Sequence, residues 1–116
     1  MLDFRLTSEQ EELRARAREF ALKEILPAAA YYDEKNIVPV EILKKAFHAG
    51  FMGTDIPAEY GGRGYGLIEG ALITEEISAA CTGLATSIFV NSLGFEPIVL
   101  SDREHIKKKY LSILAR

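Results

Sequence analysis

Hydrophobic residues recur every three or four positions along most of the chain, which is the spacing of one face of an α-helix. The first such stripe consists of Leu13, Ala17, Phe20 and either Leu22 or Ile25. No segment shows strict alternation of polar and apolar residues, the pattern typical of a β-strand, over a useful length. The pattern therefore predicts an all-α fold of about five helices.

Local signals predict the ends of the first helix. Thr7-Ser8-Glu9-Gln10 fits a capping box, in which the Thr7 hydroxyl accepts from the Gln10 amide and the Gln10 side chain reaches back. Pro27 interrupts the pattern and predicts a kink, after which the helix continues to about Asp33. We interpret the three arginines of this helix as a solvated face paired with glutamates, and not as an anion site: Arg14, Arg16 and Arg18.

The second helix is expected to begin with Pro39 at its first helical position and to end at Gly50 in a left-handed conformation. Phe51 is expected to fold back on Ala46. His48 lies in the last turn, where a positive imidazole would suit the helix dipole. Because no flanking residue supplies a partner, we interpret His48 as structural and not as a catalytic base.

Residues 52–66 form an extended connector in which four glycines occur within residues 61–66. A phosphate-binding loop is not supported, because no lysine follows Gly66 and the glycine spacing does not match a dinucleotide fingerprint. The connector instead predicts a tight loop whose glycines adopt positive φ and which Tyr60 and Tyr65 hold in place.

The least polar part of the chain follows the connector. Residues 67–80 and 84–95 predict two helices separated by Cys81-Thr82-Gly83, and Pro97 is expected to restart the chain. Between Glu76 and Glu96 there is no charged residue, yet Gly, Ser, Thr and Asn interrupt the segment too often for a membrane span. These helices are therefore predicted to form the buried centre of the domain, and a wall of a binding site is the further role left open for them.

A last helix is predicted to start at a second capping box, Ser101-Asp102-Arg103-Glu104. Its apolar side consists of Ile106, Tyr110, Ile113 and Leu114. The lysine run at residues 107–109 is interpreted as a solvated face and not as a nucleic-acid patch.

Composition narrows the function classes. The chain of 116 residues has 48% hydrophobic and 27% charged residues, which is ordinary for one globular domain. A formal charge of −3 and a pI near 5.4 argue against a nucleic-acid partner. With one cysteine, Cys81, an intramolecular disulfide and a thiolate metal cluster are excluded. The first residues lack a basic segment followed by an apolar run, so we expect a cytoplasmic protein.

Several short motifs occur in the order and spacing of one known family. They are Thr7-Ser8-Glu9-Gln10, Pro27-Ala28-Ala29-Ala30, Ala49-Gly50-Phe51-Met52-Gly53, Ile56-Pro57-Ala58-Glu59-Tyr60-Gly61-Gly62, Glu75-Glu76-Ile77, Cys81-Thr82-Gly83, Asn91-Ser92-Leu93-Gly94 and Lys107-Lys108-Lys109-Tyr110-Leu111. From Leu6 to Leu114 the chain resembles the N-terminal domain of the acyl-CoA dehydrogenases, most closely the medium- and short-chain branch. The resemblance implies an orthogonal bundle of about five helices.

The resemblance also implies an activity for the complete enzyme. Members of the family are FAD-dependent and oxidise an acyl-CoA to its trans-2-enoyl form, with a glutamate that takes the α-proton and a hydride transferred to the flavin. The electrons then pass to an electron-transfer flavoprotein, and a homo-oligomer is implied. The catalytic glutamate and most flavin contacts belong to a middle β domain and a C-terminal helical domain, which are expected to be absent from residues 1–116. We therefore assign no catalytic, cofactor or metal residue, and expect the isolated chain to be inactive and to bind no cofactor.

The resemblance also assigns one group of residues in this chain to a substrate site. In the family, the helix after Cys-Thr-Gly forms part of the wall and floor of the acyl pocket. The corresponding positions are Ala85, Thr86, Phe89 and Leu93, and their spacing places them on one face of a helix. The alternative is that these residues are plain core packing. For the chain as a whole, the alternatives are a stand-alone helical binding or scaffold module and one chain of a split enzyme.

Overall fold

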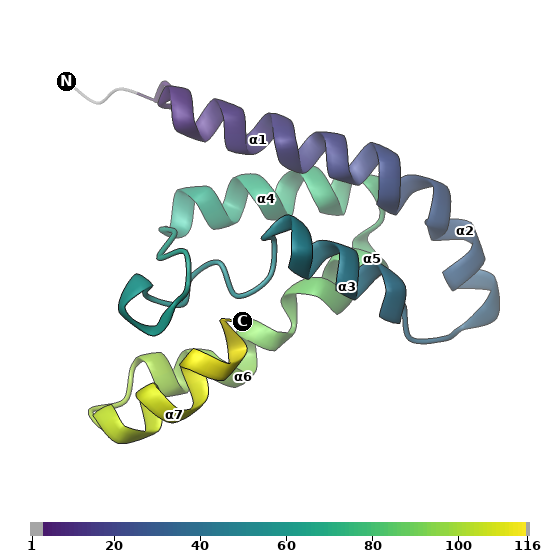
Figure 1. The fold of residues 1–116 in the computed structure, drawn as a ribbon. Coiled ribbons are helices and arrows are strands. Elements are labelled where there is room, and N and C mark those ends of the chain that lie inside the picture. The colour runs from purple at the N-terminus through teal and green to yellow at the C-terminus, as the bar shows by residue number, and fades with distance from the viewer. Residues whose placement is uncertain (1–3, 116) are drawn as a thin grey trace.

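The computed structural model describes residues 4–115, and every regular element within that range is a helix. A continuous rod consists of α1 (Ser8–Phe20), the short π-helical segment η1 (Ala21–Ile25) and α2 (Leu26–Lys35). The other elements are α3 (Val40–Ala49), the 3-10 helix η2 (Ala58–Tyr60), α4 (Leu67–Ala80), α5 (Thr82–Phe89), α6 (Asn91–Val99) and α7 (Glu104–Leu114). Because α5 and α6 also follow each other almost without a break, the described segments form about five helical rods (Figure 1). The prediction of an all-α bundle is confirmed.

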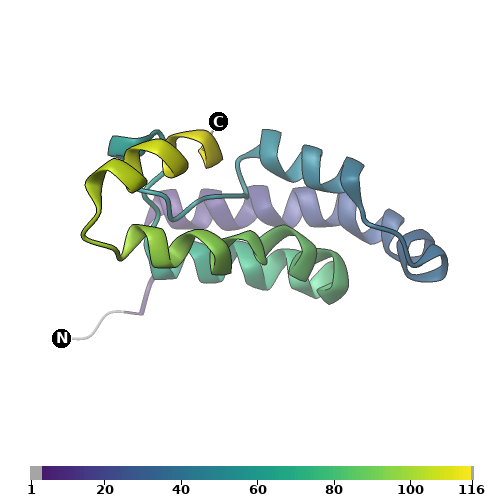
Figure 2. The ribbon, with the colours of Figure 1, turned by 90° about the horizontal axis from the view of Figure 1, so that it is seen from below.

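The bundle is a flat slab. Its principal extents are 43 × 42 × 19 Å, and Figure 2 shows it from below. The radius of gyration is 15.1 Å, whereas a compact domain of this length has about 13 Å. A slab of this kind exposes more surface than a sphere would, so apolar residues on its broad faces are difficult to bury internally.

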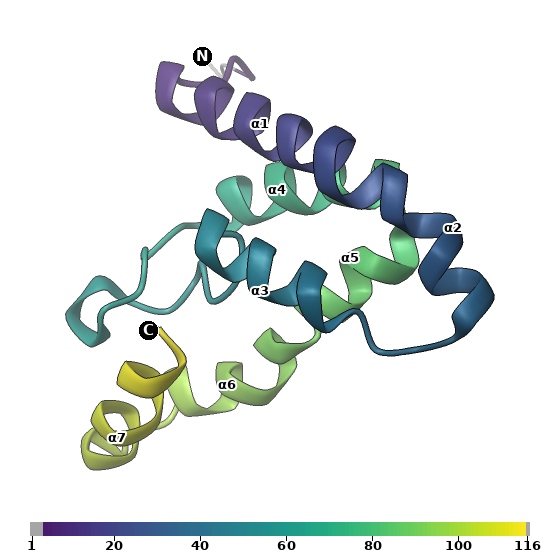
Figure 3. The ribbon, with the colours of Figure 1, turned by 45° about the vertical axis from the view of Figure 1, so that its right-hand side comes forward.

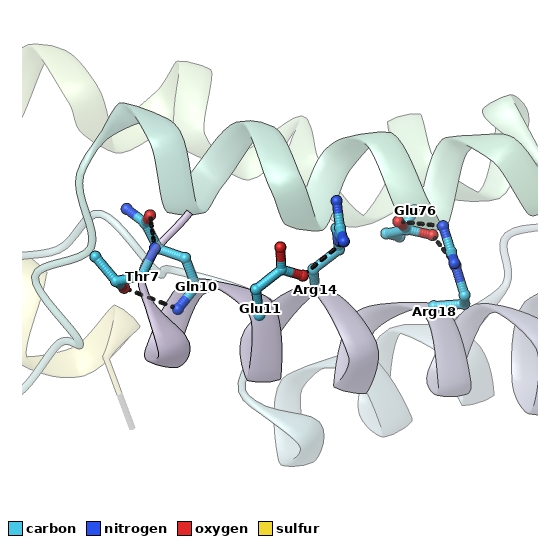
Figure 4. A network of polar contacts seen from close by, with 6 residues as sticks. All are labelled: Thr7, Gln10, Glu11, Arg14, Arg18 and Glu76. Atoms are coloured by element: carbon cyan, nitrogen blue, oxygen red, sulfur yellow. Dashed lines mark hydrogen bonds and ion pairs between the residues drawn. The ribbon is translucent and has the colours of Figure 1, made fainter. Parts of the chain in front are cut away.

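Two polar contacts hold α1 and α4 side by side and parallel. Near their N-terminal ends the Gln10 amide donates to the Glu69 carboxylate at 2.7 Å. Two turns further along, the Arg18 guanidinium donates to both oxygens of Glu76, each at 2.8 Å (Figure 4). The sequence offset is nearly the same in both pairs, as parallel helices require. The predicted capping box is confirmed: the Thr7 backbone donates to Gln10 at 3.0 Å, and the Gln10 backbone donates to Thr7 Oγ1 at 3.2 Å.

The main core lies between the first rod, α3, α4 and α5. Its buried members are Leu13, Ala17, Phe20, Ala21, Ile25, Ile42, Ala46, Phe51, Ile73, Ile77, Leu84, Ala85 and Ile88. Of the two candidates that could complete the first stripe, Ile25 is fully buried and Leu22 is 56% exposed. The π-helical segment explains the choice, because its wider turns rotate the later residues relative to the α-helical face. This segment ends two residues before Pro27, which cannot donate a backbone hydrogen bond, and the rod bends there (Figure 1).

The end of α3 matches its prediction. Gly50 has φ +80°, the Gly50 amide donates to the Phe47 carbonyl at 2.9 Å, and the Phe51 amide donates to the Ala46 carbonyl at 2.9 Å. These two bonds are a Schellman motif. Phe51, 2% exposed, is thereby directed into the core. The start is shifted by one residue: Pro39 is the N-cap, and Val40 is the first helical residue.

The break between the two central helices is shorter than predicted. Cys81 alone is extended, at φ −165° and ψ 110°, and α5 begins at Thr82. The predicted helix over residues 84–95 is in fact divided at Val90. The Ser92 hydroxyl donates to the Phe89 carbonyl at 2.7 Å, while the Leu93 amide bonds the Val90 carbonyl instead. Side-chain bonds of this kind compete with the helical backbone ladder and bend it.

Two predictions for the C-terminal part are wrong. Pro97 does not restart the chain but lies inside α6, where packing of the neighbouring apolar residues outweighs one lost backbone bond. No capping box opens α7: the Ser101 hydroxyl accepts from the Arg103 amide at 3.2 Å, and Arg103 is the N-cap. Glu104 is therefore the first helical residue and not the third, as the box would require, and its carboxylate accepts from the Tyr60 hydroxyl.

A second, separate core joins the connector to the last two helices. Its buried residues are Ile56, Tyr60, Phe95 and Leu111, with Ile98, Val99 and Ala115 packed against them. In Figures 1 and 3, α6 and α7 lie together, away from α1. Within residues 4–115, no helix is both long and apolar enough to cross a membrane. The cytoplasmic location stays a prediction.

Candidate functional site

A cleft of about 450 Å³ lies between the first half of α4, the α5–α6 bend and the connector. Three groups of residues line it. They are Phe51, Met52, Gly53, Thr54, Asp55, Tyr65 and Gly66 from the connector and its start; Leu67, Gly70, Ala71, Ile73 and Thr74 from α4; and Ile88, Phe89, Asn91, Ser92, Glu96, Val99 and Leu100 around α5 and α6. The cleft thus separates the main core from the second core.

The α4 wall is built by residues at positions i, i+3, i+4 and i+7: Leu67, Gly70, Ala71 and Thr74. This spacing places them on one helix face. The buried residues of the same helix are Leu72, Ile73, Glu76 and Ile77, and of these Ile73 also lines the cleft. The sequence interpretation placed this helix in the core, with a binding-site wall as the alternative, but it named no residue of the helix for such a wall. The sequence did indicate such a wall. Because α4 is apolar on both sides, packing against one neighbour leaves a second apolar face for another contact.

Hydrogen bonds within the connector shape the opposite wall. The Tyr65 amide donates to the Thr54 carbonyl, and the Gly64 amide donates to the Ile56 carbonyl, both at 2.9 Å. Gly53 and Gly64, each at φ +62°, permit the reversals that bring these backbone segments together. The predicted positive φ of connector glycines is confirmed at Gly53, Gly61 and Gly64 and is wrong for Gly62 and for Gly66, whose φ is −83°.

The chemistry of the lining favours an apolar ligand. The described lining contains no lysine or arginine, and its charged groups are the carboxylates of Asp55 and Glu96. A phosphate group there would meet like charge and no cation. Thr54, Thr74 and Asn91 are among the lining residues that supply hydrogen-bonding groups. The cleft can therefore hold a hydrocarbon chain whose polar end lies outside it.

The structure separates the four predicted substrate-binding residues. Phe89 is half-buried, packs against the main core and lines the cleft. Ala85 is 1% exposed and belongs to the main core. Thr86 and Leu93 are exposed, and the Val90 bend places them on different helices. The Thr86 hydroxyl donates to the Thr82 carbonyl at 2.9 Å.

Other ionisable groups have structural partners away from the cleft. His48 is exposed, and its Nδ1 lies 2.6 Å from the Lys44 carbonyl oxygen. The hydrogen bond with Glu76, followed by its charge, raises the pKa of Arg18. Arg14 pairs with Glu11 and Arg18 with Glu76 (Figure 4), in line with the interpretation of arginines paired with glutamates, whereas Arg16 donates to the Ala49 carbonyl at 3.3 Å. Among the described residues, no group of three His, Cys, Asp or Glu side chains could hold a metal ion.

Comparison with known proteins gives a consistent result. A family model described as the acyl-CoA dehydrogenase N-terminal domain matches residues 7–116. The chain is 40% identical over 114 residues to the probable medium-chain specific acyl-CoA dehydrogenase 2, mitochondrial, of Caenorhabditis briggsae, covering 98% of this chain and 28% of that protein.

Solved structures share the fold. Butyryl-CoA dehydrogenase from Megasphaera elsdenii superposes with a TM-score of 0.84 at 28% identity, over 98% of this chain and 31% of that one. An acyl-CoA dehydrogenase of Bacillus anthracis complexed with FAD gives a TM-score of 0.73 at 35% identity, over 95% of this chain and 19% of that one. The chain spans less than a third of the length of each of these three relatives.

Proposed function

The chain belongs to the acyl-CoA dehydrogenase family as its N-terminal domain, and on this premise we propose that its cleft receives the hydrocarbon part of an acyl-CoA. The observation that carries the proposal is an apolar cleft without lysine or arginine in its described lining, with Phe89 at one wall. An acyl chain gains about 0.8 kcal/mol per methylene buried there. The phosphate-bearing part of the substrate lies outside it, away from Asp55 and Glu96.

The four predicted residues take different parts in this proposal. Phe89 limits how far the chain enters, because its ring borders the cleft. Thr86 and Leu93, which are exposed, form a wall that faces the remainder of the enzyme. Ala85 supports the wall from behind: its small side chain fills the core where α5 packs on α4 and α3.

We propose that the complete enzyme is an FAD-dependent dehydrogenase that forms a trans-2-enoyl-CoA and reduces an electron-transfer flavoprotein. FAD supplies the hydride acceptor when bound. The described lining of the cleft does not fit the cofactor, because a diphosphate there would meet two carboxylates and no cation. The role of this domain is therefore to bind and orient the acyl chain and to exclude water from it.

The chain-length test is Phe89→Ala in the full-length enzyme, with kcat/KM measured across acyl-CoA lengths. Removing the ring opens room for two or three methylenes, so longer substrates should gain about 2 kcal/mol relative to short ones. Ile42→Ala is the control, because Ile42 is buried in the main core and does not line the cleft. The control should lose about 2–5 kcal/mol of stability with an unchanged length profile. If the Phe89→Ala enzyme is folded and its chain-length preference is unchanged, the Phe89 ring contributes only to core packing.

The isolated chain is expected to bind no flavin and to lack dehydrogenase activity. The measurement is a titration of the 116-residue chain with FAD, followed by flavin fluorescence. We expect no saturation, because the described cleft offers the diphosphate no cation. Saturable FAD binding at micromolar concentration would contradict this part of the proposal. It would not affect the assignment of the cleft to the acyl chain, which the Phe89→Ala measurement tests separately.

A further inference from the structure

Gly70 lies inside a helix whose backbone does not require glycine there. It is the fourth residue of α4, and its amide donates to the Gly66 carbonyl at 3.1 Å. The described glycines with positive φ do not include Gly70, so another residue could adopt its backbone conformation. Glycine within a helix is less stable than alanine, because it loses more conformational freedom on folding. Gly70 therefore weakens α4 without any benefit to the backbone of that helix.

Close packing against a neighbouring element does not explain Gly70 either. Helices that approach each other closely often meet at a glycine, because a larger side chain would collide with the partner. A Cβ added at Gly70 would meet no atom of a neighbouring element within 4 Å. Gly70 is nevertheless half-buried, so it borders an open space that other parts of the domain partly enclose.

The open space beside Gly70 belongs to the cleft. Gly70 lines the cleft together with Ala71, its neighbour on the same helix face, and with Ser92 and Val99 of α6. Gly94, in α6, provides the contrast: an added Cβ there would also meet nothing within 4 Å, but Gly94 is exposed and does not line the cleft. The absence of a side chain at Gly70 thus adds room to the cleft, whereas at Gly94 it does not.

Room of this kind affects acyl chains of different length unequally. A chain that enters the cleft with its polar end outside fills more of the cleft as the chain becomes longer. A side chain that projects into the cleft therefore collides with long chains before it collides with short ones. Each methylene that is kept out of an apolar site costs about fourfold in affinity. The space beside Gly70 thus matters most for the longest chains that the cleft accepts.

We propose that Gly70 is a specificity-determining residue: the open space beside it holds the distal methylenes of the acyl chain and extends the range of substrates to longer chains. This inference rests on the proposed function of the cleft as the acyl-chain site. Gly70 and Phe89 have opposite effects on the size of the cleft, because the Phe89 ring occupies part of its border and Gly70 leaves part of its border open.

The test introduces side chains at Gly70 in the full-length enzyme and measures kcat/KM for saturated straight-chain acyl-CoA substrates of increasing length. Gly70→Ala adds one methyl group and should lower kcat/KM about fourfold for the longest accepted substrates. Gly70→Leu adds four carbons and should lower it by about tenfold or more. In both variants, kcat/KM for the shortest substrates should remain near the wild-type value.

Gly94→Ala and Gly94→Leu are the matched controls, because they make the same changes at a helical glycine that does not line the cleft. Both should leave the chain-length profile unchanged. Thermal unfolding of the same enzymes checks the fold: Gly70→Ala and Gly94→Ala should unfold at or above the wild-type temperature, because alanine favours a helix more than glycine does.

Three results would overturn the assignment of Gly70. The first is an unchanged length profile in Gly70→Leu, and the second is an equal loss of kcat/KM at all chain lengths, which would indicate a general disturbance. The third is a lower unfolding temperature in Gly70→Ala but not in Gly94→Ala, which would show that the glycine serves contact with the remainder of the enzyme. If Gly70→Leu fails to fold, the profile of Gly70→Ala decides.

The Phe89→Ala measurement separates this inference from the proposed function. If Phe89→Ala shifts the length profile and Gly70→Leu does not, only the assignment of Gly70 is wrong. If neither substitution shifts the profile, the assignment of the cleft to the acyl chain is wrong as well.

Discussion

At the scale of single residues, close backbone approach decides where glycine is required. A Cβ on Gly62 would lie 2.0 Å from the Ile56 carbonyl oxygen, a group that the neighbouring Gly64 amide holds in place. A Cβ on Gly94 would meet nothing within 4 Å. Gly62 is therefore required for the fold of the connector, whereas Gly94 only increases the backbone flexibility of α6.

Substitution by alanine should separate these two roles. Gly62→Ala should destabilise the domain by about 1–3 kcal/mol, because backbone must move to admit the methyl group. Gly94→Ala, inside a helix, should stabilise it by about 0.5–1 kcal/mol. Urea unfolding followed by circular dichroism gives both values. Equal effects of the two substitutions would contradict the steric argument.

At the scale of elements, the N-termini of α1 and α4 are joined through their caps. Gln10 caps α1 by accepting from Thr7, and its amide donates to Glu69. Glu69 in turn accepts from the Gly66 amide at the start of α4, at 3.1 Å. One glutamine therefore caps a helix and sets the register of a parallel helix pair.

Gln10→Ala should lower the free energy of unfolding by about 1 kcal/mol, since it removes both contacts. The hydrogen bond from Gln10, with backbone donors, holds the pKa of Glu69 below its ordinary value of 4.5. A lowered pKa contributes stability above pH 4.5 that is lost as pH falls through the folded-state pKa. The stability difference between wild type and Gln10→Ala should therefore shrink below about pH 4.5.

The control for this substitution is Glu12→Ala, an exposed position on the same helix, which should change stability by less than about 0.5 kcal/mol. Chemical denaturation at several pH values measures both variants. If the difference in unfolding free energy between wild type and Gln10→Ala is unchanged at about pH 3, the ionised Glu69 carboxylate does not contribute to it.

At the scale of the whole molecule, the flat slab leaves large apolar side chains in solvent. The most exposed on α4, α6 and α7 and after α6 are Leu67 at 93%, Leu100 at 80%, Leu93 at 70% and Ile113 at 65%. Monomeric proteins rarely expose contiguous apolar patches beyond a few hundred Å². These side chains are therefore candidates for contact with the remainder of the enzyme or with a second subunit.

Self-association of the 116-residue chain is the expected consequence, through the surface around α5 and α6 or through α7. Sedimentation over a wide concentration range should show a shift toward dimers or larger species as concentration rises. Leu93 and Ile113 changed together to lysine should reduce it. Val38→Lys, an equally exposed position in the α2–α3 loop, is the control and should not. A monomer at all concentrations would contradict the prediction.

Local chemistry determined much of this fold. The Thr7–Gln10 capping box and the Gly50 termination of α3 involve residues within five positions of one another, so their sequence is sufficient. The all-α class followed in the same way from helical periodicity. The order and spacing of the short motifs from Leu6 to Leu114 are likewise enough to indicate the family.

Tertiary contacts decided the remainder. Glu104 is the first residue of α7 instead of its third, and its carboxylate accepts from Tyr60, 44 residues earlier, a partner that no local pattern indicates. Pro97 stayed within α6 because the second core holds that helix in place. The cleft also depends on tertiary contacts, because its walls come from segments that are distant in sequence. The helical spacing of residues in α5 places Phe89 on one helix face but does not show which segment lies opposite that face. Local patterns specify helices and their ends, whereas the partners of each face depend on long-range packing.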